Sequence, residues 1–297
     1  MEPSAVHGAS EHLRGVLLVA TATVAWSLAG FFTRLIPLDA WTILVWRGAF
    51  GGVFIGLYVV WRYGRRTLAV TRAMGWPGCL ITACSTLGMT SFIPALKLTS
   101  VAHVAIIFAT SPFLAAGMAR LWLGERSSGA TLLASALSFL GVLLAVGGPQ
   151  GRASLLGDLL AFVMTTAIAT MTVAIRRYRD TALLPTACLS NLLGSLVSLG
   201  AAQPLAASSL DLVYLALFGF VQMTMGLTLF TIGSRLIPAA ETALIGALET
   251  PLAPFWVWLA FGETVGSRTI AGGALVMAAV IGHVLLQSRR ALASSGP

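Results

Sequence analysis

The chain has 297 residues, of which 57% are hydrophobic and 9% charged, with a mean hydropathy of +0.90 and a net charge of +8. Soluble domains carry roughly a quarter charged residues, so this composition excludes a soluble globular protein and predicts that lipid surrounds the chain. The cations form no basic helix, which excludes a nucleic acid as partner. The three cysteines all fall within apolar segments, which excludes a disulfide framework.

Ten apolar segments follow one another along the chain, each about as long as the ~30 Å hydrocarbon core of a bilayer requires. Lipid offers the backbone no hydrogen-bond partners, so each segment is expected to be an α-helix. The predicted fold class is an all-α integral membrane protein with ten transmembrane helices. They cover approximately residues 14–34, 40–61, 74–96, 101–122, 130–147, 155–176, 184–200, 211–233, 240–260 and 268–287.

The distribution of lysine and arginine predicts the orientation of the chain. If the N-terminus is cytoplasmic, 13 of the 18 cations lie in cytoplasmic regions, four lie outside, and Arg47 falls within a helix. Cytoplasmic loops are rich in these residues, so both termini are expected in the cytoplasm, at a bacterial-type inner membrane. The cytoplasmic cations would be Arg14, Arg62, Arg65, Arg66, Arg72, Arg120, Arg126, Arg176, Arg177, Arg179, Arg235, Arg289 and Arg290, and the outer ones Arg34, Lys97, Arg152 and Arg268.

One segment of the sequence occurs twice. Residues 95–125, ALKLTSVAHVAIIFATSPFLAAGMARLWLGE, align without a gap with residues 233–263, GSRLIPAAETALIGALETPLAPFWVWLAFGE, at an offset of 138. We therefore expect two five-helix repeats, 13–148 and 149–288, between disordered cytoplasmic tails at 1–12 and 289–297. Because five is odd, the second repeat would be inverted. Such assemblies are commonly transporters with a central substrate cavity between the halves.

The repeated segments carry a recognisable pattern. ALKxTSxA…SPF…LGE at 95–125 and RLIPAAExAL…LETPLAPxWxWLxFGE at 235–263, together with GDLLA at 157–161, resemble the EamA-like branch of the drug/metabolite transporter superfamily. The resemblance covers essentially the whole chain. It implies a ten-helix carrier with both termini cytoplasmic that exports small metabolites, amino acids above all.

Proline distinguishes the two copies. Pro112 aligns with Thr250, whereas the second copy has Pro251 and Pro254. Proline removes a backbone hydrogen bond, so the three prolines are predicted hinges for alternating access. The kink in the ninth helix is expected about one turn away from that of its counterpart.

Glu249 is the leading candidate for substrate binding. It lies near the middle of the ninth helix, where a lone carboxylate costs about 3 kcal/mol or more unless it is paired or hydrated. It could bind a substrate ammonium or a proton, and Trp256 shares its helical stripe. Arg47 is expected to extend toward the outer interface, although it could instead meet a substrate carboxylate or Glu249.

The other candidate residues are polar, aromatic or sulfur-containing side chains within helices. Together they predict a mildly polar lumen that suits amino acids with apolar or aromatic side chains better than phosphorylated metabolites, which would need arginine clusters. The predicted substrate-binding residues are Glu249, Trp26, Ser27, Thr82, Ser85, Met89, Thr166, Thr170, Gln222 and Trp256.

Several charged or titratable residues are expected to have structural roles only. His103 and Glu241, at the starts of two helices, are interpreted as caps, and Glu125 and Glu263 as turn caps at the membrane interface. His283 is expected to be a packed histidine near the inner face.

No GxxxxGK[ST], HExxH or GxSxG motif occurs, so ATP hydrolysis by a P-loop, metal-dependent hydrolysis and serine catalysis are not indicated. We expect no enzyme, cofactor or metal, and transport driven by a gradient. The expected partners are a small-molecule substrate and the lipid bilayer, with the chain a monomer or homodimer. Three alternatives stay open: an exporter of drugs or other metabolites such as nucleotide sugars, a non-saturable channel, and an intramembrane enzyme.

Overall fold

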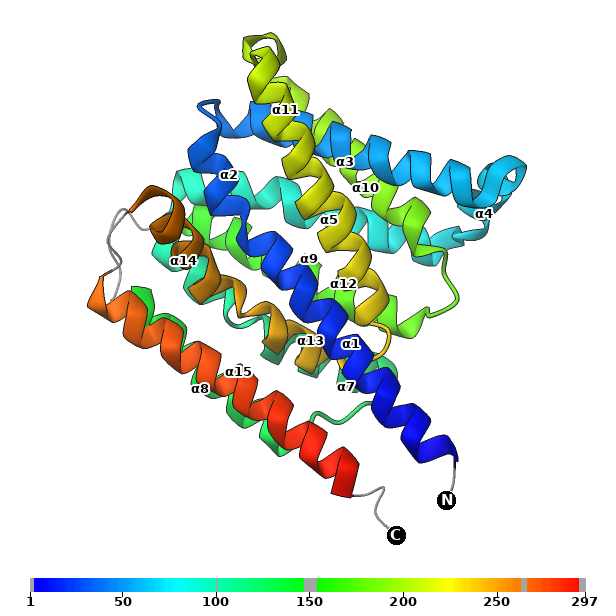
Figure 1. The fold of residues 1–297 in the computed structure, drawn as a ribbon, viewed down its shortest axis with the longest axis vertical. Helices are drawn as coiled ribbons and strands as arrows, with labels where there is room; N and C mark the ends of the chain where they lie inside the picture. Colours follow the sequence, from blue (N-terminus) through cyan, green and yellow to red (C-terminus); the bar gives the residue numbers. More distant parts are fainter. Residues whose placement is uncertain (1–2, 100, 147–153, 263–265, 294–297) are drawn as a thin grey trace.

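The computed structural model of the protein describes residues 3–99, 101–146, 154–262 and 266–293. Within these ranges the chain is helical and has no strand, which confirms the all-helical fold (Figure 1). In chain order the elements are α1 (Pro3–Ser27), α2 (Ala29–Leu35), α3 (Ala40–Tyr63), η1 (Gly64–Arg66), α4 (Thr67–Ala73), α5 (Gly75–Leu98), α6 (Val101–Phe108), α7 (Ser111–Leu123), α8 (Gly129–Val146), α9 (Leu155–Arg177), α10 (Leu183–Ser198), η2 (Leu199–Ala201), η3 (Pro204–Ala206), α11 (Ser209–Phe218), η4 (Gly219–Gly226), α12 (Leu227–Gly233), α13 (Ala239–Gly246), α14 (Glu249–Phe261) and α15 (Ser267–Ala293).

Among the described residues, eight helical segments are long and apolar enough to cross a membrane. They are Glu11–Leu35, Ala40–Ala73, Ile106–Leu123, Leu155–Arg177, Leu183–Ala201, Ser209–Gly233, Ala239–Phe261 and Ser267–Leu286. Gly129–Ala145 is apolar but shorter. The chain is therefore a multi-pass membrane protein in which each of the ten predicted segments is helical.

Helices also reach into both segments that were expected to be disordered. α1 begins at Pro3, and α15 continues to Ala293. Extending an existing helix adds one hydrogen bond per residue fixed, without the cost of a new nucleus, and the sequence after 288 is rich in helix-forming Arg, Ala and Leu. The start of α1 and the end of α15 lie at the same end of the molecule, which we call the terminal face (Figure 1).

The bounds of several helices repeat with the sequence offset. α6 and α13 begin at 101 and 239 and end at 108 and 246, whereas α7 and α14 begin at 111 and 249 and end at 123 and 261; each pair of numbers differs by 138. Gly124 and Gly262 then cap α7 and α14 in the left-handed conformation, with φ of 71° and 66°. Glycine adopts this conformation without strain.

The prediction that the ninth helix kinks about one turn away from its counterpart is therefore wrong. The fourth and ninth helices both break at the same aligned position, just before Ser111 and Glu249. Pro112 and Pro251 each lie in the first turn of the helix that follows the break. The backbone N–H groups of a first turn have no partner within the helix, so proline is tolerated at either position without moving the break.

Corresponding helices of the two repeats pack against each other. α8 lies along α15 and α3 along α10, and the first pair is seen side by side in Figure 1. α7 packs against α13, which is the counterpart of α6. A Cβ atom on Gly272 of α15 would stand 2.3 Å from the carbonyl oxygen of Gly141 and 2.4 Å from the nitrogen of Ala145, both on α8. Only glycine at this position allows the two backbones to approach so closely.

Candidate functional site

A chain of hydrogen bonds joins four helical elements in the interior of the protein. Arg47 of α3 donates to the side-chain oxygen of Gln222 in η4. Gln222 forms two hydrogen bonds with Trp26 of α1. The side-chain Nε2 of Gln222 donates to the backbone carbonyl of Trp26 at 3.2 Å, and the backbone carbonyl of Gln222 accepts from the Trp26 indole at 3.0 Å. Next along α1, Ser27 accepts a 2.8 Å hydrogen bond from the Trp256 indole of α14.

Local backbone irregularities position this chain. η4 is a π-helical stretch, a wider helix that occurs mostly as a short insertion and often at functional sites. At its start, a Cβ on Gly219 would lie 2.7 Å from the carbonyl oxygen of Arg47, so glycine brings η4 directly against α3. α1 ends at Ser27, and a new helix starts at Ala29. The polar side chains therefore meet where two of the long helices depart from regular geometry.

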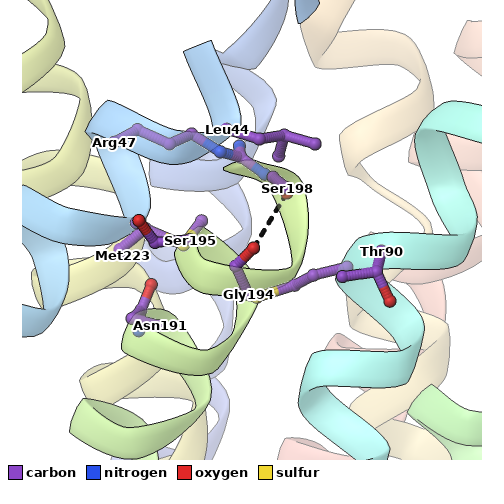
Figure 2. A pocket seen from close by; sticks show the side chains of 10 residues that line it. Leu44, Arg47, Thr90, Asn191, Gly194, Ser195, Ser198 and Met223 are labelled. Atoms are coloured by element: carbon purple, nitrogen blue, oxygen red, sulfur yellow. Dashed lines mark hydrogen bonds between the residues drawn. The ribbon is translucent and has the colours of Figure 1, made fainter. Parts of the chain in front are cut away.

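Arg47 does not extend toward the outer interface as the sequence analysis expected. Its guanidinium contacts Gln222 and lies 5.4 Å from the centre of the Phe218 ring, which suits a cation–π contact. The side chain also lines a pocket between α3, α5, α10 and η4 (Figure 2). The inward orientation has a physical reason: the protein supplies an amide acceptor and an aromatic face that lipid does not offer.

The pocket beside Arg47 is narrow. It is lined by Leu44, Arg47, Gly48, Met89, Thr90, Asn191, Gly194, Ser195, Ser198 and Met223 (Figure 2). Only about 10 Å³ of its space is open to the centres of water molecules, close to the minimum for a single water. A substrate of amino-acid size therefore requires a more open conformation than this one. The buried Oδ1 of Asn191 has no hydrogen-bond partner among the described residues, which leaves one acceptor free in this wall.

Glu249 occupies the first position of α14, directly after the break in the ninth helix. Its side chain is half-buried and is close enough to Arg47 for an electrostatic interaction. Within the described part of the chain, the carboxyl group of Glu249 takes part in no hydrogen bond and in no ion pair shorter than 4.0 Å. The Arg47 guanidinium and the Glu249 carboxyl group thus lie near each other, the first bonded to an amide and the second without a close partner among the described residues.

The remaining predicted residues are distributed over other contacts. Thr82 of α5 lies against α10, with its hydroxyl 3.4 Å from the carbonyl of Thr186, and Ser85 is buried. Thr170 donates to the carbonyl of Thr166 at 2.7 Å, and the hydroxyl of Thr166 is buried without a partner in the described structure. Of the ten predicted substrate-binding residues, only Met89 lines the pocket beside Arg47. The side chain of the predicted hinge residue Pro254 lies outside the described residues.

Comparison with known proteins decides the family. The model of the EamA-like transporter family matches residues 13–147 and 155–285, so it covers both repeats and most of the chain. The chain belongs to this family. A search of curated proteins finds no match for this EamA-like transporter. A solved structure described as "Crystal structure of protein" superposes with a TM-score of 0.78 at 19% identity over 93% of this chain and 98% of the other, which shows a shared fold.

A second polar cluster lies at the terminal face of this EamA-like transporter. Glu241 of α13 is 1% exposed, and its Oε2 lies 3.1 Å from Nε2 of His12 on α1. Its Oε1 lies 3.6 Å from Nε2 of His283 on α15, which is also buried. From the sequence, Glu241 is expected to be a helix cap and His283 a packed residue. The sequence does not indicate the cluster, because His12 and Glu241 are 229 residues apart.

An ion pair lies beside this cluster. Arg176 at the end of α9 donates from Nε to both carboxylate oxygens of Glu125, at 2.7 and 2.9 Å, and from Nη1 to the carbonyl of Ile237 at 2.7 Å. The interpretation of Glu125 as a simple turn cap is therefore wrong, because its carboxylate pairs with a distant helix. The side chain of His103 and all of Glu263 lie outside the described residues.

Proposed function

We propose that this EamA-like transporter is a secondary carrier that exports amino acids with apolar or aromatic side chains. The two five-helix halves would be inverted relative to each other and alternate in exposing a central site. The observation that carries the proposal is that the guanidinium of Arg47 and the carboxyl group of Glu249 lie close enough to interact within the helix bundle. A free amino acid carries the complementary pair, a carboxylate and an ammonium.

Each charge has a role in this proposal. Arg47 would bind the substrate carboxylate through its guanidinium fork, with the hydrogen bond to Gln222 holding the side chain in place. Glu249 would bind the ammonium, since its carboxylate has no close partner among the described residues. Ionised groups within the membrane cost several kcal/mol and usually serve a function. A substrate bearing both charges would offset that cost by neutralising each group.

The inverted arrangement is supported by packing, and ten membrane crossings are supported by the helical structure of the ten predicted segments. Helices that correspond in the two repeats contact each other, as α8 contacts α15 and α3 contacts α10. Such self-complementary contacts are those of a two-fold relation between halves. The excess of arginine and lysine in alternate loops supports placing the terminal face in the cytoplasm. The narrow pocket then represents a state that holds no substrate of amino-acid size.

Transport by purified protein in proteoliposomes tests the proposal. We expect saturable uptake of labelled phenylalanine, accelerated when unlabelled phenylalanine is present on the other side. Phenethylamine and phenylacetate should each compete less well than phenylalanine, because each lacks one of the two charges. A flux that does not saturate would indicate a channel, and stronger competition by nucleotide sugars or cationic drugs would indicate another substrate class.

Two charge-removing variants test the site itself. Glu249→Gln and Arg47→Gln should each lower transport at limiting substrate about tenfold or more, since one charged hydrogen bond contributes about 1.5–3 kcal/mol. Glu11→Gln and Arg126→Gln are the matched controls, because both side chains are exposed, and they should leave transport unchanged. Normal transport by folded Glu249→Gln protein would contradict the proposed site.

A further inference from the structure

The His12–Glu241–His283 cluster contains polar atoms that are buried without hydrogen-bond partners. These are Oε1 of Glu241 and both ring nitrogens of His283, within the part of the chain that the structure describes. Leaving such atoms unpaired is costly in a buried site, so the cluster requires an explanation. Among the described residues, no group of three or more His, Cys, Asp or Glu side chains could hold a metal ion.

We propose that these three residues form a proton-binding site in which a bound proton holds the terminal face of the carrier closed. The cluster draws together three helices, because His12 lies on α1, Glu241 on α13 and His283 on α15. α1 belongs to the first repeat and the other two helices to the second, so opening this face between the halves would separate His12 from the carboxylate. The gating role rests on the proposed transport function, whereas the proton site itself can be tested without transport.

Burial distinguishes the two histidines. His283 is completely enclosed, and a proton on both ring nitrogens would leave an N–H at Nδ1 without an acceptor among the described residues. The side chain of His12 is 27% exposed, so its Nδ1–H can reach water while its Nε2–H donates to Glu241 at 3.1 Å. His12 is therefore the residue that takes up the proton. His283 stays neutral, with its Nε2 3.6 Å from Oε1 of the same carboxylate.

The other charged groups around Glu241 leave this assignment intact. Arg176 on α9 interacts electrostatically with His12, but Glu125 at the end of α7 compensates its charge. Arg235 precedes α13 and donates to the carbonyl of Thr181, and Arg120 of α7 is exposed. α8 and α12 carry no titratable residue, and Glu249 of α14 lies more than two helical turns along from Glu241.

The direction of the pH effect follows from linkage. In the closed state the His12 imidazolium faces a buried carboxylate, whereas after opening it would face water. Protons therefore bind more tightly to the closed state, and any ligand shifts the equilibrium toward the state that it binds better. Acidification on this side should keep the face closed, and a rise in pH should favour its opening.

Amide hydrogen exchange in the purified protein tests the site directly. The exchange rates are first corrected for their intrinsic pH dependence. Protection of the segments around His12 and around residues 239–243 should then fall about tenfold between pH 5.5 and 8. A tenfold difference in proton affinity between the closed and the open state would produce this change. His12→Gln should abolish the pH dependence, because its amide does not titrate. His283→Gln should keep it.

The outcomes separate this inference from the transport proposal. If the unmodified protein showed the same protection from amide hydrogen exchange at pH 5.5 and at pH 8, the proton site would be overturned without any variant. Persistence of the pH effect in folded His12→Gln protein, or its loss only in His283→Gln, would overturn the assignment to His12. A pH-dependent closure in a protein that does not transport amino acids would leave the proton site standing and contradict the proposed substrate.

Discussion

Arg176 forms contacts that no other cationic side chain could reproduce. Its Nε donates to both oxygens of Glu125, and its Nη1 donates to the carbonyls of Ile237 and Arg235, at 2.7 and 3.4 Å. The side chain is 11% exposed and that of Glu125 30%. A guanidinium can direct several N–H groups in a fixed plane, whereas an ammonium is a single point of charge. Arg176 therefore ties the start of α13 to α9.

Replacing Arg176 by lysine should destabilise the protein although the charge is kept. Lysine cannot satisfy the carboxylate and the Ile237 carbonyl together, and one unmade charged hydrogen bond costs about 1–3 kcal/mol. The midpoint of thermal unfolding in detergent should fall. Arg177→Lys is the control, because the neighbouring Arg177 is exposed and should tolerate the change. Equal stability of the two variants would show that the Arg176 contacts contribute nothing measurable.

The sequence identifies candidate site residues but not their hydrogen-bond partners. Trp26, Ser27, Gln222 and Trp256 were each predicted to line the cavity, which stays a prediction; the hydrogen bonds between them in the structure were not foreseen. The inward turn of Arg47 could not be read from the sequence, because its amide partner lies 175 residues away.

Helical elements were predictable in their extent but not in their irregularities. Long apolar segments bounded by charge and by glycine, such as Gly124 and Gly262, locate the helix ends within a few residues. The π-helical geometry of η4 has no comparable sequence signal, since an i→i+5 pattern depends on how the helix packs against α1 and α3. The break in the ninth helix was expected at Pro251 or Pro254, because proline was taken as its cause, whereas the helix breaks just before Glu249.

The packing of α15 against α8 gives a prediction for a whole element. Gly272→Ala should cost about 1–3 kcal/mol, because its Cβ would meet the backbone of α8 and force the helices apart. Gly282→Ala is the matched control on the same helix: apart from the neighbouring backbone of α15 itself, nothing lies within 4 Å of its added Cβ, and alanine favours a helix. Thermal unfolding should therefore separate the two variants. Similar midpoints would mean that α8 and α15 do not pack as closely as described.

At the scale of the whole molecule, orientation in the membrane is the main prediction. With the terminal face in the cytoplasm, a cysteine introduced at Arg126 should react with a membrane-impermeant maleimide only from the inside, and one at Gln203 only from the outside. Both side chains are exposed, and the background should lack Cys79, Cys84 and Cys188. Labelling of both sites from the same side would exclude the proposed orientation.

The contacts between corresponding helices have an evolutionary consequence. α3 meets α10 and α8 meets α15, so each of these four elements faces its own duplicate. An ancestral gene of half the length could have encoded a protein whose two identical copies associated through the same surfaces, one inserted upside down relative to the other. With the inverted arrangement proposed above, fusion of two such copies would have freed each to diverge, so that Arg47 lies in one half and Glu249 in the other.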